Sequence, residues 1–299
     1  MGVPSFFKWL QAKYPLILRQ ILEGEGASQT TARVAPDNVG GGGGGSGGPE
    51  SVTVHNLYLD TNGIIHPACH PEDGPQPKDE GEMFANVEAL IDRLVRAVRP
   101  QQLLYIALDG CAPRAKMNQQ RARRFCSARE AAEADAAKQE LMARHVPGAD
   151  TSHFAAAGAA DGAGAEPKAG RWDHNVITPG TAFMARLATF LRDYVARRQH
   201  SGGPTWRNLL VVVDDAACPG EGEHKVVDYI RRLRRSPAHD PETCHAICGQ
   251  DANLIMLGLS LHEPRVLILR ERVLGVISIL GLPGFCGFRF GICASKAPH

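Results

Sequence analysis

The chain has 299 residues, and its 33 lysines and arginines against 32 aspartates and glutamates give a net charge of +1. Hydrophobic residues make up 43% of it, which is enough for a sizeable core and excludes a wholly disordered chain. The charge balance excludes a protein that is basic over its whole surface, although it is compatible with a local basic patch. The eight cysteines follow no disulfide-framework spacing, which favours a reduced, intracellular protein.

Four short apolar segments have the character of buried strands, and each leads into an acidic residue. They span residues 56–60, 103–109, 209–213 and 245–248. Between them, apolar residues at helical spacing predict one helix from Met83 to Val98 and another that starts at Thr178-Pro179. Nearly continuous apolar strands that alternate with helices predict an α/β fold, with a mostly parallel sheet flanked by helices.

The acidic residues at the strand ends predict a metal site. The carboxyl ends of parallel strands share one edge of the sheet, and ligands bind at that edge. We therefore expect Asp60, Asp109 and Asp251 to lie close together. One such aspartate could simply cap the next helix, but several in register would repel one another unless cations were present.

Two further acids, Glu221 and Glu223, lie in the motif Pro-Gly-Glu-Gly-Glu-His-Lys at residues 219–225. Its glycines permit an unusual turn and a close approach of a ligand. Oxygen ligands of this kind suit Mg²⁺ or Mn²⁺, and two such ions can activate a water and stabilise the leaving oxygen of a phosphodiester. For these two glutamates alone, a preference for a helix N-terminus explains the pattern equally well. Together with the three aspartates they favour a metal.

A basic stretch, residues 114–129, follows Asp109 closely in the sequence. If it is helical, one face carries the four side chains Lys116, Gln120, Arg123 and Arg124. Such a face can hold a phosphate through several charge-assisted hydrogen bonds. A solvated basic helix face is the alternative, and the closeness to a predicted metal ligand favours phosphate binding.

Five motifs in the same order resemble the Xrn/Rat-type 5′→3′ exoribonucleases. They occupy residues 1–10, 57–67, 109–121, 219–225 and 251–259. The resemblance runs with interruptions from Met1 to about Glu271, and the segments 70–73 and 240–263 are more similar to the nuclear branch of the family. It implies a nuclease core of the flap-endonuclease/PIN-like kind.

The resemblance also implies roles for individual residues. The metal-binding and catalytic acids correspond to Asp60, Asp109, Glu221, Glu223 and Asp251. A pocket that selects a 5′-monophosphate corresponds to Lys116, Gln120, Arg123 and Arg124. His66 corresponds to a residue that stacks on the terminal base, although taken alone it would be read as an ordinary structural histidine.

The function implied is hydrolysis of RNA from a 5′-monophosphate end with divalent metal ions, Mg²⁺ or Mn²⁺. The reaction releases 5′-mononucleotides and serves RNA turnover and processing. The partner is RNA and no membrane is involved. The expected compartment is the nucleus, with the cytoplasm as the alternative.

The chain departs from the family pattern at Asn253, where the family has a second aspartate two residues after Asp251. A further metal-binding aspartate of the family has no counterpart downstream. Both losses fall on the metal subsite shared with Asp251, so we expect one metal to bind well and the second weakly or not at all.

We expect an exoribonuclease N-terminal nuclease domain over residues 1–271, with low-complexity insertions near 24–50 and 146–170. The tail 272–299 does not resemble the family, and we interpret it as a gene-model artefact or, alternatively, as a natural truncated form. A truncated chain without the second metal site could be a catalytically impaired RNA-end-binding module. A second alternative is a flap-type DNA endonuclease, which could cut a circular substrate.

Overall fold

The computed structural model describes residues 6–14, 17–23, 31–35, 50–71, 74–145, 174–271 and 277–281. The chain divides into two compact units, one formed by residues 1–111 and 179–299 and the other by residues 112–178. The first unit contains the sheet and the predicted acids, and the second contains the basic stretch. Each unit is therefore described by itself.

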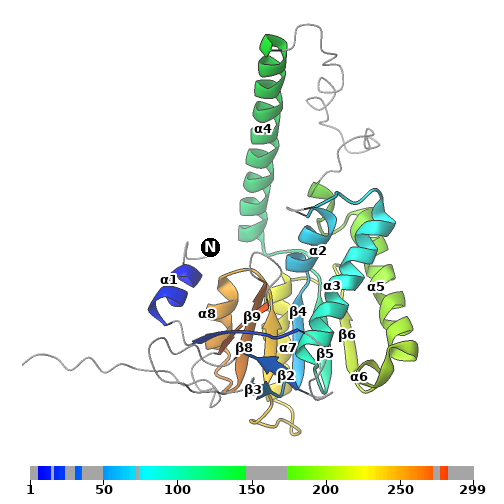
Figure 1. The fold of residues 1–299 in the computed structure, drawn as a ribbon, viewed down its shortest axis with the longest axis vertical. Helices are drawn as coiled ribbons and strands as arrows, with labels where there is room; N and C mark the ends of the chain where they lie inside the picture. The colour runs from blue at the N-terminus through cyan, green and yellow to red at the C-terminus, as the bar shows by residue number, and fades with distance from the viewer. Residues whose placement is uncertain are drawn as a thin grey trace, which may run out of the picture. The chain divides into compact units, whose positions relative to one another are not determined.

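The first unit is built on a seven-stranded sheet in the order β1-β9-β8-β7-β4-β5-β6 (Figure 1). The strands are β1 (Leu18–Gln20), β4 (Asn56–Asp60), β5 (Leu103–Ala107), β6 (Leu210–Asp214), β7 (His245–Cys248), β8 (Val266–Glu271) and β9 (Ile277–Gly281). Five neighbouring strands, from β8 to β6, are parallel, whereas β9 and β1 are antiparallel to their neighbours. This confirms the predicted α/β fold with a mostly parallel sheet flanked by helices.

Helices cover the parallel strands, which explains their uninterrupted apolar sequences. The helices of this unit are α1 (Phe6–Lys13), α2 (Asn62–Cys69), α3 (Glu80–Val98), α5 (Ala182–Ser201), α6 (Gly203–Arg207), α7 (Gly222–Arg234) and α8 (Asn253–Ser260). Tyr58 and Tyr105 point toward α7, where the ring centroid of Tyr229 lies 6.3 Å and 4.5 Å from theirs. Their strand neighbours Leu57 and Leu104 point to the opposite face and are fully buried.

The helix predicted to start at Thr178-Pro179 starts later than that. Helix α5 begins at Ala182, and Thr181 is its N-cap, with a side chain that accepts a hydrogen bond from the Met184 amide. Gly180 has a φ of 89°, a left-handed conformation that cannot belong to a right-handed helix. The helix therefore cannot extend back to Pro179, and the prediction of its start was wrong.

The second unit contains the long helix α4 (Arg114–His145) and the short 3-10 helix η2 (His174–Val176). The basic stretch is thus helical, which is the condition under which Lys116, Gln120, Arg123 and Arg124 share one face. The predicted insertion at 146–170 lies outside the described residues. The one near 24–50 includes strand β2 (Ala32–Val34), which pairs with β3 (Glu50–Val52), and β9 lies within the segment 272–299. Among the described helices, none has an apolar run long enough to cross a bilayer.

Candidate metal centre

The carboxyl edge of the parallel sheet carries the predicted acids. Asp60 is the last residue of β4, Asp109 follows β5 by two residues, and Asp251 follows β7. Glu221 and Glu223 stand at the start of α7, the helix after β6. The strand register places Asp60 level with Ala107, and Ala107 level with Asp214.

Asp60 is surrounded by other negative charges. Burial raises the pKa of Asp60 to about 7, and the charge of Asp109 is the next largest contribution. Glu223 and Asp251 raise the pKa of Asp60 further. A carboxylate raises the pKa of another carboxyl group in this way only when the two lie close together. Four of the five predicted acids therefore converge on one place: Asp60, Asp109, Glu223 and Asp251.

Gly222 connects two of these acids through its backbone. Its N–H donates a hydrogen bond to Asp109 Oδ1 over 2.6 Å, and the other oxygen of Asp109 accepts from the Asn62 side chain. A Cβ on Gly222 would lie 2.6 Å from Asp60 Oδ1 and 3.4 Å from Asp109 Oδ1. Any other residue at position 222 would therefore occupy the space between the two carboxylates.

Glu221 and Glu223 form the other side of the site. Both are buried, and their carboxylates lie within 4.8 Å of each other and of the exposed His224 imidazole. Glu221 is the N-cap residue of α7, but its side chain makes no capping hydrogen bond. The preceding Gly220 has a φ of 111°, the unusual turn that the motif suggested. Helix capping alone therefore does not explain why Glu221 is an acid.

Asp251 is exposed, and its carboxylate is held by Asn253, the residue that stands where the family has a second aspartate. Its Oδ1 accepts a hydrogen bond from the Asn253 backbone N–H at 2.9 Å, and its Oδ2 accepts one from the Asn253 side-chain amide at 3.2 Å. Asn253 thus directs a donor, not an oxygen ligand, at this carboxylate.

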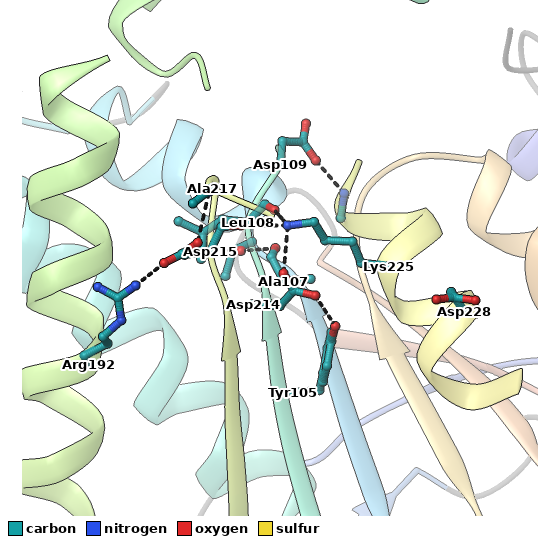
Figure 2. Close-up of polar contacts among 12 residues, drawn as sticks. Tyr105, Ala107, Leu108, Asp109, Arg192, Asp214, Asp215, Ala217, Lys225 and Asp228 are labelled. Carbon is teal, nitrogen blue, oxygen red and sulfur yellow. Dashed lines mark hydrogen bonds and ion pairs between the residues drawn. The ribbon is translucent and has the colours of Figure 1, made fainter. Parts of the chain in front are cut away.

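The two acids at the end of β6 have cationic partners (Figure 2). Asp214 accepts hydrogen bonds from the Lys225 ammonium at 2.9 Å and from the Tyr105 hydroxyl over 2.5 Å. Asp215 pairs with Arg192 and also accepts from a backbone amide. These aspartates are neutralised by the protein itself, so they are poor candidates for metal ligands.

The remaining predicted residues belong to helices α2 and α4. His66 is exposed on α2, the helix that begins with Asn62, a partner of Asp109. Lys116, Gln120 and Arg123 lie on α4 in the second unit, where Lys116 and Gln120 are half-buried and Arg123 is exposed. The side chain of Arg124 lies outside the described residues.

Two residues of this region, His224 and Lys225, are part of the motif at residues 219–225 but were not predicted to have a role. His224 completes the cluster with Glu221 and Glu223, and its position directly after Glu223 was the available signal. Lys225 is buried, and nothing in the sequence marks that burial.

The donor set fits a hard divalent cation. Carboxylate oxygens dominate it, and burial, followed by the charges of the neighbouring carboxylates, raises the pKa of Asp60 to about 7. Mg²⁺ and Mn²⁺ prefer such oxygen ligands, and a bound cation relieves the repulsion among the carboxylates.

The chain is similar to known proteins over most of its length. The family model described as XRN 5'-3' exonuclease N-terminus matches residues 1–272. A 5'-3' exoribonuclease 2 of Gallus gallus is 48% identical over 91% of this chain and 27% of the relative. A 5'-3' exoribonuclease 2 homolog of Caenorhabditis elegans is 47% identical over 91% and 26%, and one of Drosophila melanogaster is 45% identical over 92% and 28%.

The chain thus spans about a quarter of the length of these relatives. The nucleases of this family are typically metal-dependent. Since the family model covers nearly the whole described core, the chain belongs to the XRN 5'-3' exonuclease family and contains its N-terminal domain.

Proposed function

We propose that this chain provides the metal-binding and RNA-end-binding part of a 5′→3′ exoribonuclease. Its substrate is RNA with a 5′-monophosphate, and its products are 5′-mononucleotides. The observation that carries the proposal is the convergence of Asp109, Glu223 and Asp251 on the half-buried Asp60. Relatives named 5'-3' exoribonuclease 2 support the direction of the reaction and the choice of RNA.

The residues that would hold Mg²⁺ or Mn²⁺ are Asp60, Asp109, Glu221, Glu223 and Asp251. A bound divalent cation would supply an activated water and would stabilise the charge on the leaving oxygen of the phosphodiester. The Gly222 amide and the Asn62 side chain fix the Asp109 carboxylate, so this ligand is oriented before the cation binds.

The RNA end would be recognised by residues outside the acidic cluster. Lys116, Gln120, Arg123 and Arg124 lie within nine consecutive positions of α4, and the first is seven positions after Asp109 in the sequence. Three cations and an amide on one helix face suit a terminal phosphate, which offers several acceptor oxygens. His66, exposed on α2, would stack on the first base.

The second candidate is an RNA-end-binding module with impaired chemistry. The hydrogen bond from the Asn253 amide to Asp251 favours it, because a neutral donor stands where an oxygen ligand would serve a second ion. In that case one cation binds well, the second binds weakly, and the chain holds RNA ends with little turnover.

Turnover of defined RNAs separates these functions. The chain is incubated with Mg²⁺ and a radiolabelled RNA that carries a 5′-monophosphate, a 5′-triphosphate or no free end. The proposed function predicts release of 5′-mononucleotides from the first RNA alone, with none from the Asp60→Asn variant. Binding of the monophosphate RNA without products supports the second candidate, and cutting of the circular RNA, which has no free end, would contradict both.

The similarity of residues 70–73 and 240–263 to the nuclear branch, together with the names of the relatives, supports action in the nucleus. The cytoplasm is the alternative.

A further inference from the structure

Lys225 is a buried lysine in the first turn and a half of α7. Its side chain is 5% exposed, and its ammonium donates three hydrogen bonds (Figure 2). The acceptors are the Leu108 carbonyl at 2.9 Å, Asp214 Oδ1 at 2.9 Å and the Asp215 carbonyl at 2.7 Å. An ammonium has three N–H groups, so this one is fully satisfied.

The three acceptors lie at the ends of two strands. The Leu108 carbonyl belongs to the peptide bond that leads into Asp109, just beyond β5. Asp214 ends β6 and Asp215 follows it, and the Asp214 carbonyl accepts a hydrogen bond from the Leu108 amide at 2.9 Å. The Tyr105 hydroxyl donates to the other oxygen of Asp214. Lys225 thus fixes the path of the chain immediately before Asp109.

The same helix turn also fixes Asp109 from its other side. The Gly222 amide donates to the Asp109 carboxylate at 2.6 Å, and the Lys225 backbone N–H donates to the Glu221 carbonyl at 3.0 Å. Asp109 is therefore held at its main chain by Lys225 and at its carboxylate by Gly222. Glu221 and Glu223 flank Gly222 on the same turn.

We propose that Lys225 is a positioning residue of the metal centre, which sets Asp109 at a fixed distance from Glu221 and Glu223. The inference rests on the proposed metal site. The ammonium carries out this role through the backbone, because it donates to the Leu108 carbonyl in the peptide bond that leads into Asp109. Its positive charge is balanced by Asp214, so the cation site keeps its own negative charge.

A purely structural role makes a different prediction. If Lys225 served only as the counterion of the partly buried Asp214, its loss would lower thermal stability and leave the geometry of the folded site unchanged. An arginine would then replace it fully. If Lys225 positions Asp109, arginine keeps the charge but its planar fork cannot direct three bonds to converging acceptors.

The test compares Lys225→Met and Lys225→Arg with the wild type, and Arg232→Met is the matched control. Arg232 lies on the same helix, and its ion pair with Asp228 is exposed. Two properties are measured below each melting temperature: hydrogen exchange of the Gly222 amide in the metal-free protein, and Mn²⁺ affinity by calorimetry.

We expect Lys225→Met to lower Mn²⁺ affinity roughly 10–100-fold, which is typical for loss of an outer partner of a metal ligand, and to speed exchange of the Gly222 amide. Lys225→Arg should recover the thermal stability of the wild type, but only part of its Mn²⁺ affinity and of its slow exchange at the Gly222 amide. Arg232→Met should match the wild type in all three properties. Lys225→Arg decides the question if Lys225→Met does not fold.

The proposal would be overturned if either Lys225 variant folds, binds Mn²⁺ as tightly as the wild type and exchanges the Gly222 amide at the wild-type rate. If the wild type itself binds no Mn²⁺, the proposed function fails. The Gly222 exchange rates still decide in that case whether Lys225 positions Asp109.

Discussion

Acidic residues end neighbouring strands of one sheet, yet β4 and β5 differ from β6 in what surrounds those acids. The aspartates at the end of β6 have cations of the protein as partners, Lys225 for Asp214 and Arg192 for Asp215. Asp60 and Asp109, at the ends of β4 and β5, lie among other carboxylates. The same residue type at the same edge therefore serves two purposes.

Their pKa values express this difference. Burial opposes ionisation of Asp214, but hydrogen bonds from Tyr105 and Lys225 outweigh burial and lower its pKa. Burial raises the pKa of Asp60 to about 7, and neighbouring acids add to this effect. An acid that the protein has neutralised belongs to the scaffold, whereas a group of acids that repel one another requires a cation from outside.

The largest effects are expected when one acid is removed from each group, Asp60 from the acids that lie among other carboxylates and Asp214 from the acids that pair with cations. At pH 8 without metal, Asp60→Asn should raise the free energy of unfolding by about 1–2 kcal/mol, because it removes a half-buried charge that other carboxylates repel. Asp214→Asn should lower the same free energy by about 2–3 kcal/mol, because Lys225 loses its counterion. Urea unfolding followed by circular dichroism measures both. Changes of the same sign in the two variants would contradict the division into two groups.

A buried group at the opposite edge of the sheet provides a second contrast. His245 begins β7, and its Nδ1 lies 3.0 Å from the Tyr58 hydroxyl and 3.5 Å from the Asn56 amide nitrogen. Burial lowers the pKa of His245 to about 4, with smaller contributions from other histidines. The neutral ring therefore stabilises the fold above its unfolded pKa of about 6.5, and this stability is lost as the pH falls toward 4.

The corresponding variant is His245→Gln. Between pH 7 and pH 5 the wild type should lose about 2 kcal/mol of unfolding free energy relative to this variant, since only the wild type must bind a proton there. Urea titrations at the two pH values measure the difference. Parallel pH dependence of the two proteins would show that His245 does not titrate in this way.

A change at Asn253 tests which acids form a complete site. Asn253→Asp replaces the amide that donates to Asp251 by a carboxylate. It should create or strengthen a second Mn²⁺ site, roughly tenfold in affinity, because one negative charge is added beside Asp251. Calorimetric titration with Mn²⁺ measures it, and Asn253→Ser is the control that removes the amide without adding charge. An unchanged isotherm would indicate that the second ion depends on other residues.

The smallest effect is expected where the partner of a scaffold acid is exposed. The Arg192 side chain is 55% exposed, and its partner Asp215 also accepts a hydrogen bond from the Ala217 amide. Arg192→Met should therefore change the unfolding free energy by less than about 1 kcal/mol and leave Mn²⁺ affinity unchanged. A larger loss in urea unfolding would mean that Asp215 depends on Arg192 more than its exposure suggests.

The sequence predicted four of the five parallel strands, β4, β5, β6 and β7, because each is a nearly continuous apolar segment. Strands β1, β8 and β9 were not predicted: β1 has only three residues, and β9 lies in a segment that was interpreted as a tail. The start of α5 was misplaced because Gly180 interrupts a pattern that otherwise resembles a cap followed by proline.

The sequence could place acids at one edge of the sheet, but it could not separate scaffold acids from candidate ligands. That separation depends on Lys225, whose carbonyl partner Leu108 is 117 positions away along the chain. A lysine in a helix usually reads as exposed. Its burial follows from the meeting of α7 with the ends of β5 and β6, which no local pattern encodes.

The most direct test of the metal centre is a calorimetric titration of the metal-free wild type with Mn²⁺, beside Asp60→Asn and Arg192→Met. The account predicts one well-defined site in the wild type and in Arg192→Met, and none in Asp60→Asn. Two comparable sites in the wild type would contradict the assignment of a weakened second site. Absence of binding, or binding that survives Asp60→Asn unchanged, would contradict the metal centre itself.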